Sequence, residues 1–147
     1  MTTGVVPALS LFVGVTGHRR VVDEALPALS AQIESVLKRL ETEAAGIRRV
    51  LLSGLADGPD QLFVELALKR NWEVIASLPM PYADYLADFA TEAKREALAK
   101  LKAKCAGTIE IPWSAVRDPD PAGAREKQYR EHAIFLARHS QVVVAMW

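Results

Sequence analysis

Hydrophobic and polar residues alternate along the chain with two different periods. Apolar runs of strand length occupy residues 9–15, 50–53, 72–78, 108–113 and 141–147. Between them, apolar residues recur at steps of three and four, which predicts amphipathic helices over residues 26–44, 59–70, 82–101 and 125–139. The last apolar run is nearly continuous, a pattern typical of a strand buried on both faces.

The order of these segments predicts the fold class. Five strands separated by four helical segments form repeated β-α-β units, whose crossovers are right-handed and build a parallel sheet. We therefore predict an α/β, Rossmann-like three-layer α/β/α fold with a parallel sheet of about five strands. The 147 residues suit one domain over 1–147, which is large enough to bury its own core. The longest irregular stretch is a Pro/Asp/Gly loop over residues 114–123.

Charge and composition argue against a global attraction to polyanions. The 18 Lys and Arg residues are balanced by 18 Asp and Glu residues, and only 7% of the residues are aromatic. A nucleic-acid partner is therefore not expected, because single strands are held by basic grooves with interleaved aromatic side chains. Cys105 is the single cysteine, and no signal peptide or membrane-length apolar run occurs. These features predict a cytoplasmic protein with no membrane partner.

The turn after the first strand carries residues suited to an anion. Thr16 offers a hydroxyl donor, Gly17 allows close approach of the backbone, and Arg19 offers a bidentate guanidinium, with His18 and Arg20 beside it. We expect these residues to bind a phosphate. The alternative is that Gly17 only forms a turn and that the arginines are solvated.

The loop after the second strand reads Ser-Gly-Leu-Ala-Asp-Gly-Pro-Asp over residues 53–60 and leads into a helix. Gly54 and Gly58 expose backbone N–H groups beside the positive end of the helix dipole, which favours an anion. Asp57 and Asp60 either cap the helix or accept hydrogen bonds from ribose hydroxyls, and capping is slightly favoured for Asp60.

The connection after the third strand is stiffened by prolines and suits the wall of a base-binding pocket. Pro79 and Tyr82 are the candidates, because a tyrosine ring stacks on a base. Tyr85 lies on the apolar stripe of the following helix and is expected in the core. His132 and His139 are interpreted as ordinary helix residues, whereas Tyr129 has the option of facing the site.

Familiar catalytic and cofactor motifs are missing from the sequence. The turn at residues 14–17 lacks the first glycine of a dinucleotide fingerprint, no Gly-Lys pair marks a P-loop, and no Gly-x-Ser-x-Gly elbow occurs. The three His and one Cys are scattered at spacings that do not suit zinc. We therefore expect no cofactor and no metal, and the sequence leaves open whether the protein is an enzyme.

Four segments taken together resemble the SLOG superfamily of Rossmann-like nucleotide-binding domains, whose members include LOG phosphoribohydrolases and DNA-processing protein A. These are Gly-Val-Thr-Gly-His-Arg at 14–19, the loop at 52–60, Leu-Pro-Met-Pro-Tyr at 78–82 and the closing residues 138–147. The resemblance implies a nucleotide or ADP-ribose-like ligand. It implies that the ligand is bound by Thr16, Gly17, His18 and Arg19 and by Ser53, Gly54, Ala56, Asp57 and Gly58.

The chain departs from the family's patterns in two ways. LOG-type enzymes carry a Pro-Gly-Gly-x-Gly-Thr segment before a catalytic Glu, whereas no Gly-Gly pair occurs here. Relatives with the Gly-His-Arg turn continue past the last strand into an Asp-Gly and a Gly-Gly-Thr loop, which do not follow Trp147. The resemblance therefore implies a domain that lacks the family's C-terminal segment, or one completed by another segment or subunit.

Three functions are compatible with these residues. The leading hypothesis is binding or sensing of a nucleotide or nucleotide-derived ligand at the C-terminal edge of the sheet. The alternative is hydrolysis of a nucleotide N-glycosidic bond, for which Asp57 and Asp60 are the available carboxylates. A single-stranded DNA-binding module is the least favoured. The expected partner is a small nucleotide-derived molecule, with a homo-oligomer, an effector domain or another subunit left open.

Overall fold

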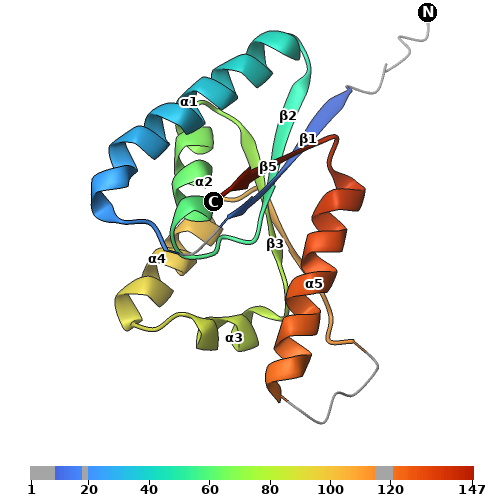
Figure 1. Cartoon of the computed structure of the whole chain (residues 1–147). Helices are drawn as coiled ribbons and strands as arrows, with labels where there is room; N and C mark the ends of the chain where they lie inside the picture. Colours follow the sequence, from blue (N-terminus) through green and yellow to red (C-terminus); the bar gives the residue numbers. More distant parts are fainter. Residues whose placement is uncertain (1–8, 18–19, 115–120) are drawn as a thin grey trace, which may run out of the picture.

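The computed structural model describes residues 9–17, 20–114 and 121–147. Its five strands are β1 (Ser10–Gly17), β2 (Arg48–Ser53), β3 (Glu73–Leu78), β4 (Gly107–Glu110) and β5 (Val142–Met146). They form one parallel sheet in the order β4-β3-β2-β1-β5 (Figure 1). The predicted fold class, a three-layer α/β/α fold with a five-stranded parallel sheet, is confirmed.

The helices cover the two faces of the sheet unequally. They are α1 (Leu26–Glu43), α2 (Pro59–Lys69), α3 (Tyr82–Tyr85), α4 (Glu92–Ala103) and α5 (Pro121–His139), with 3₁₀ turns η1 (Asp23–Ala25) and η2 (Leu86–Asp88). The connections through α1, α2 and α4 all step in one direction across the sheet, so right-handed crossovers place these helices on one face. The connection through α5 steps back to β5 and places α5 on the opposite face (Figure 1).

The core follows from this arrangement. Alternate residues of β1 and β2, such as Val13, Val15 and Leu51, are buried under α1 and α2 in the larger apolar cluster. On the other face, Leu136 of α5 packs on Val50 and Leu52 in a smaller cluster. Among the described residues, no helix combines the length and apolar character that a membrane span requires.

Two predicted elements differ from the observed ones. The single helix expected over residues 82–101 is interrupted, because Phe89 adopts an extended conformation and Thr91 starts α4 as its N-cap, its hydroxyl accepting from the Lys94 N–H at 3.2 Å. The strand expected over residues 108–113 ends at Glu110, before Pro112. Most of the expected loop 114–123 lies outside the described residues, and α5 already begins at Pro121.

β5 also differs from its prediction as a strand buried on both faces. It lies at the edge of the sheet, and its side chains alternate between half-buried and exposed. Val142, Val144 and Met146 pack toward the larger cluster, whereas Val143 is 46% exposed on the α5 side. The apolar run therefore reflects an edge strand whose second face α5 leaves largely uncovered.

Candidate functional site

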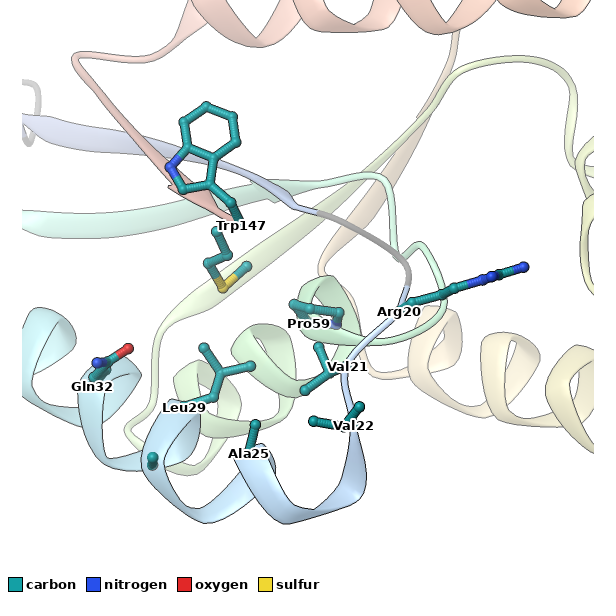
Figure 2. Close-up of a pocket in the computed structure, with 10 residues that line it drawn as sticks. Arg20, Val21, Val22, Ala25, Leu29, Gln32, Pro59 and Trp147 are labelled. Carbon is teal, nitrogen blue, oxygen red and sulfur yellow. The ribbon is translucent and has the colours of Figure 1, made fainter.

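The strand order creates one topological switch point. β1 lies between β2 and β5, and the chain approaches these two neighbours through helices on opposite faces of the sheet. In open parallel sheets, ligands bind beyond the carboxyl ends of the strands at such a point. A pocket of about 430 Å³ lies there, a size typical of small-molecule sites (Figure 2).

The pocket is formed by the segment after β1, by α1, by the start of α2 and by the end of β5. Its lining residues are Arg20, Val21, Val22, Ala25, Ala28, Leu29, Gln32, Pro59, Met146 and Trp147. Most of these side chains are apolar, and hydrogen-bonding groups come from Arg20, Gln32 and the indole N–H of Trp147. Figure 2 shows Arg20 and Gln32 on opposite sides, with Leu29 and Pro59 between them. The Arg20 side chain extends away from the other labelled residues, so its guanidinium lies at the rim of this group.

The predicted ligand-binding residues of the turn after β1 do not point to one common place in the structure. A Cβ atom added to Gly17 would meet the Met146 carbonyl oxygen at 3.1 Å, so the glycine allows β5 to approach β1 closely. Thr16 is exposed and alternates with buried Val15, which places its side chain on the α5 side of the sheet, away from the pocket under α1. His18 and Arg19 lie outside the described residues.

The β2–α2 loop is shaped by hydrogen bonds within itself. Ser53 is fully buried, and its hydroxyl oxygen accepts from the Leu55 N–H at 3.1 Å. Leu55 has a left-handed φ of 54°, and the Gln61 side-chain amide donates to its carbonyl oxygen at 3.0 Å. Gly58 has a φ of 100° at the N-cap of α2, a conformation that favours glycine. These contacts fix the conformation of the loop.

The two carboxylates of this loop lie in different environments. The Asp57 carboxylate pairs with the Lys94 ammonium of α4 at 2.9 Å, while Asp60 is buried in the first turn of α2. A negative side chain is stabilised by the positive end of a helix dipole. An anionic ligand at the start of α2 therefore has to bind beside the carboxylate of Asp60 at the positive end of the same helix dipole. Ala56 is half-buried and contributes only backbone polar groups to the loop.

The third connection lies away from the pocket. Pro79 is buried, and its carbonyl oxygen accepts from the Gln128 amide at 3.0 Å. The Tyr82 N–H donates to the Glu110 carboxylate at 3.1 Å, and the Lys102 ammonium lies 4.8 Å from the centre of the Tyr82 ring. Neither Pro79 nor Tyr82 lines the pocket at the switch point.

The expected core position of Tyr85 is confirmed, since the side chain is buried. Its hydroxyl donates to the Gly54 carbonyl oxygen at 2.9 Å, a contact that the apolar pattern does not reveal. Tyr129, considered as a site residue, instead has its hydroxyl hydrogen-bonded to the Asp88 carboxylate of η2. Both tyrosines therefore hold the elements that surround the carboxyl edge.

His132 has a role that the sequence analysis missed. Its Nε2 atom lies 3.0 Å from the Ser77 hydroxyl, and burial lowers the pKa of the imidazole to about 4. A Cβ atom on Gly54 would lie 2.8 Å from the His132 Cε1 atom, so the glycine makes room for the ring. A signal was available, because His132 lies one turn before Leu136 on the apolar side of the predicted helix.

A metal site does not emerge from the part of the chain that the structure describes. Within residues 9–17, 20–114 and 121–147, no three His, Cys, Asp or Glu side chains lie together as metal ligands would. The polar groups at the carboxyl edge instead contact one another or the backbone. The arrangement can bind a small ligand through shape and a few polar contacts.

Comparisons with known proteins give matches in structure. No protein-family model and no curated protein matches the sequence. DNA processing protein A from Streptococcus pneumoniae is 19% identical with a TM-score of 0.55, and 92% of this chain covers 41% of it. The protein TM1055 is 15% identical with a TM-score of 0.52, and 92% of this chain covers 59% of it.

A second DNA processing protein A, from Helicobacter pylori, is 17% identical with a TM-score of 0.50, and 92% of this chain covers 53% of it. Its structure is described in terms of a single-stranded DNA binding mode. The chain thus spans about half the length of these solved structures.

These matches correct the expectation that a nucleic-acid partner is disfavoured. A protein described as binding single-stranded DNA shares the fold, so nucleic acid was wrongly judged an unlikely partner. The physical error was to use the zero net charge of the whole chain, because binding depends on the charge along the contacted edge. At these levels of identity the likeness concerns the fold. The chain shares with these structures the Rossmann-like α/β fold that its sequence pattern predicts.

Proposed function

We propose that the chain binds a nucleotide or nucleotide-derived ligand in the pocket at the switch point between β1 and β5. The supporting observation is the pocket itself, which lies where parallel sheets of this type bind ligands and has a volume of about 430 Å³. The resemblance of the flanking motifs to nucleotide-binding domains is consistent with this proposal.

The lining residues suggest how the parts of such a ligand are bound. The apolar side chains around Leu29 and Met146 suit the faces of a base or a ribose. The Gln32 amide both donates and accepts, which suits the edge of a base. Arg20 offers a guanidinium for a phosphate, in addition to the predicted contacts of His18 and Arg19.

Calorimetric titration with ADP-ribose, NAD and nucleoside monophosphates tests this proposal. Ala28 is an exposed residue of α1 that lines the pocket, so Ala28→Trp fills the space without entering the core. Ala31 is also exposed on α1 but does not line the pocket, which makes Ala31→Trp the matched control. We expect at least tenfold weaker binding in Ala28→Trp and unchanged binding in Ala31→Trp.

Two results would count against this pocket. One is the absence of binding heat with every nucleotide, and the other is equal affinity in the two tryptophan variants. Chromatography of the same mixtures reports any release of free base. Such release would favour the hydrolase alternative, in which Asp57 and Asp60 are the available carboxylates.

Single-stranded DNA is a second candidate ligand, favoured by the likeness to the DNA processing protein A structures. Fluorescence anisotropy with a labelled oligonucleotide tests it over a series of salt concentrations. Binding through phosphates weakens as salt increases, whereas binding of a small nucleotide in an apolar pocket changes much less. Ala28→Trp then shows whether the oligonucleotide uses the same pocket.

A further inference from the structure

The face of the sheet that carries α5 has a groove between α5 and β4. Two adjoining hollows of about 420 and 260 Å³ form it, and they share the lining residues Ile109, Phe135, Arg138 and His139. The floor of the larger hollow comes from three strands and consists of Phe12, Leu52 and Ile75. The groove shares no lining residue with the pocket at the switch point, so it is a separate candidate site.

The groove exposes apolar surface that a ligand can cover. Ile109 is 40% exposed and Ile134 of α5 is 36% exposed, and both line the smaller hollow. Parallel sheets are normally covered by helices on both faces, but α5 is the one helix that the described residues place on this face. The larger hollow alone has the volume of a small-molecule site, which favours a short ligand over a further helix.

One end of the groove can bind a carboxylate. Arg138 lines both hollows, and its guanidinium forms no ion pair within the described residues. The Gln141 side chain lines the larger hollow, and its amide oxygen accepts from the Phe12 N–H at 2.8 Å. This hydrogen bond fixes the orientation of the amide and leaves its N–H groups to donate. A guanidinium and an amide donor together suit the two oxygens of a carboxylate.

The other end of the groove can bind an ammonium group. Glu110 and Glu131 line the smaller hollow and do not line the larger one. The Glu110 carboxylate accepts from the Tyr82 N–H at 3.1 Å, which holds it at the end of β4. Neither glutamate forms an ion pair in the part of the chain that the structure describes. Two carboxylates without a paired cation attract a positive charge.

The spacing of the two ends indicates the length of the ligand. Glu131 and Arg138 lie seven residues apart on one side of α5, which is two helical turns or about 10 Å. Ile134 and Phe135 lie midway between them and also line the groove. An extended peptide rises about 3.3–3.6 Å per residue, so about three residues span this distance. A free tripeptide carries an ammonium group at one end and a carboxylate at the other.

We propose that the groove binds a short apolar peptide of about three residues with free termini. Its amino group binds between Glu131 and Glu110, and its carboxylate binds Arg138 and Gln141. An apolar side chain of the peptide covers the floor of the larger hollow. A fatty acid matches the groove less well, because its apolar end would lie beside the two glutamates. Neither the proposal nor its test depends on a ligand in the pocket at the switch point.

Calorimetric titration with the tripeptide Leu-Ala-Leu tests the proposal, with N-acetylated and C-amidated forms of the same peptide for comparison. We expect each blocked form to bind the wild type about threefold more weakly or worse, because one ion pair is lost. In Glu131→Gln, acetylation should cause little further loss of affinity. In Arg138→Gln, the same should hold for amidation. This matching of one terminus to one residue also determines the direction of the peptide.

Two other variants of α5 are the matched controls. Glu126 and Arg130 are exposed and line neither hollow, so Glu126→Gln and Arg130→Gln should bind all three peptides as the wild type does. Glu131 and Arg138 are exposed as well, so their variants should unfold at the wild-type temperature. Weaker binding by these variants then reports the groove and not the stability of the fold.

Four results would overturn the proposal. The first is the absence of binding heat with the free peptide, and the second is equal affinity of the wild type for free and blocked peptides. The third is binding of octanoate as tight as that of the peptide, which would show that the groove selects an apolar anion. The fourth is an affinity that falls as the protein concentration rises, because a second copy of the chain would then compete for the groove.

Discussion

The Nε2 atom of His132 on α5 lies 3.0 Å from the hydroxyl of Ser77 near the end of β3. The same ring packs against the backbone of Gly54 at the start of the β2–α2 loop. One imidazole therefore connects the helix on the second face with two strand ends at the carboxyl edge. Because the ring is held in its neutral form by burial, this connection depends on pH.

We expect the free energy of unfolding to fall as the pH drops from about 6.5 to about 4. The pKa of His132 is lowered from 6.5 to about 4 in the folded chain, so the unfolded chain binds more protons in this window. The loss amounts to about 3 kcal/mol at the acidic end, at 1.4 kcal/mol for each unit. Urea denaturation between pH 7.5 and pH 4.5 measures it.

Two histidine variants show whether His132 causes this loss. His132→Gln should reduce the slope of stability against pH, and His139→Gln, a change at an exposed residue at the end of α5, is the matched control variant. Equal slopes in the wild type and in His132→Gln would refute the assignment.

Gly54→Ala should destabilise the fold through the same contact. The added Cβ atom would lie 2.8 Å from the His132 Cε1 atom, so the ring has to move, while the backbone of Gly54 has no positive φ that would add strain. We expect a loss of about 1–3 kcal/mol, as for other overpacked positions. Thermal denaturation should show that Gly107→Ala costs less than about 0.5 kcal/mol, because nothing lies within 4 Å of that added atom.

A double variant then identifies the clashing group. Gly54→Ala combined with His132→Ala should lose less stability than the sum of the two single changes, because the smaller side chain leaves room for the methyl group. Strict additivity would show that the methyl group clashes with something other than the ring.

The fold was predictable because its signals are local. Apolar runs and helical periods identified the five strands and the four main helical segments, and the right-handed crossover rule then predicted a parallel sheet between two layers of helices. The interruption at Phe89 was missed, because Tyr85 and Phe89 are four residues apart and fit one apolar stripe of a continuous helix. In the structure their ring centroids lie 5.1 Å apart although the helix ends before Phe89. The edge position of β5 was missed because an apolar run does not report strand order.

The candidate site was predictable only in its location. Sequence motifs indicated the loops at the carboxyl edge, but the pocket is lined largely by α1 and β5 residues such as Leu29 and Met146, which carry no chemical signature. Gly17 and Gly54 remain predicted ligand contacts, and the structure adds that both glycines allow close packing, against Met146 and His132 respectively. Such contacts between distant segments depend on tertiary structure.

Gln128→Leu should cost about 1–3 kcal/mol, although leucine has a similar volume. The Gln128 amide is fully buried and donates to the carbonyl oxygens of Pro79 and Pro112, both at 3.0 Å, and it accepts from the Ser114 N–H at 3.2 Å. Leucine removes this partner from all three backbone groups, and Pro79 is the buried residue among them, so its carbonyl oxygen loses a hydrogen bond that water does not readily replace. Chemical denaturation measures the loss.

Gln128→Glu provides the matched comparison for that variant. A carboxylate keeps the acceptor for Ser114 but removes both donors and adds a buried charge, so it should be at least as destabilising as leucine. A loss below about 1 kcal/mol in both variants would contradict the structural role of the amide.

Two aspartates at the carboxyl edge should respond differently to the same substitution. The Asp88 side chain is 17% exposed and accepts hydrogen bonds from the Arg125 guanidinium at 2.8 Å and from the Tyr129 hydroxyl. The Asp57 side chain is 37% exposed, and its partner in the described contacts is the Lys94 ammonium. We expect Asp88→Asn to cost about 2 kcal/mol, because the largely buried network loses its negative charge and one of the two oxygens that accept from Arg125 and Tyr129. Asp57→Asn should cost less than about 1 kcal/mol, as for exposed ion pairs. Urea denaturation in low and high salt checks both values, and a larger loss in Asp57→Asn would show that its carboxylate fixes the β2–α2 loop more strongly than its exposure indicates.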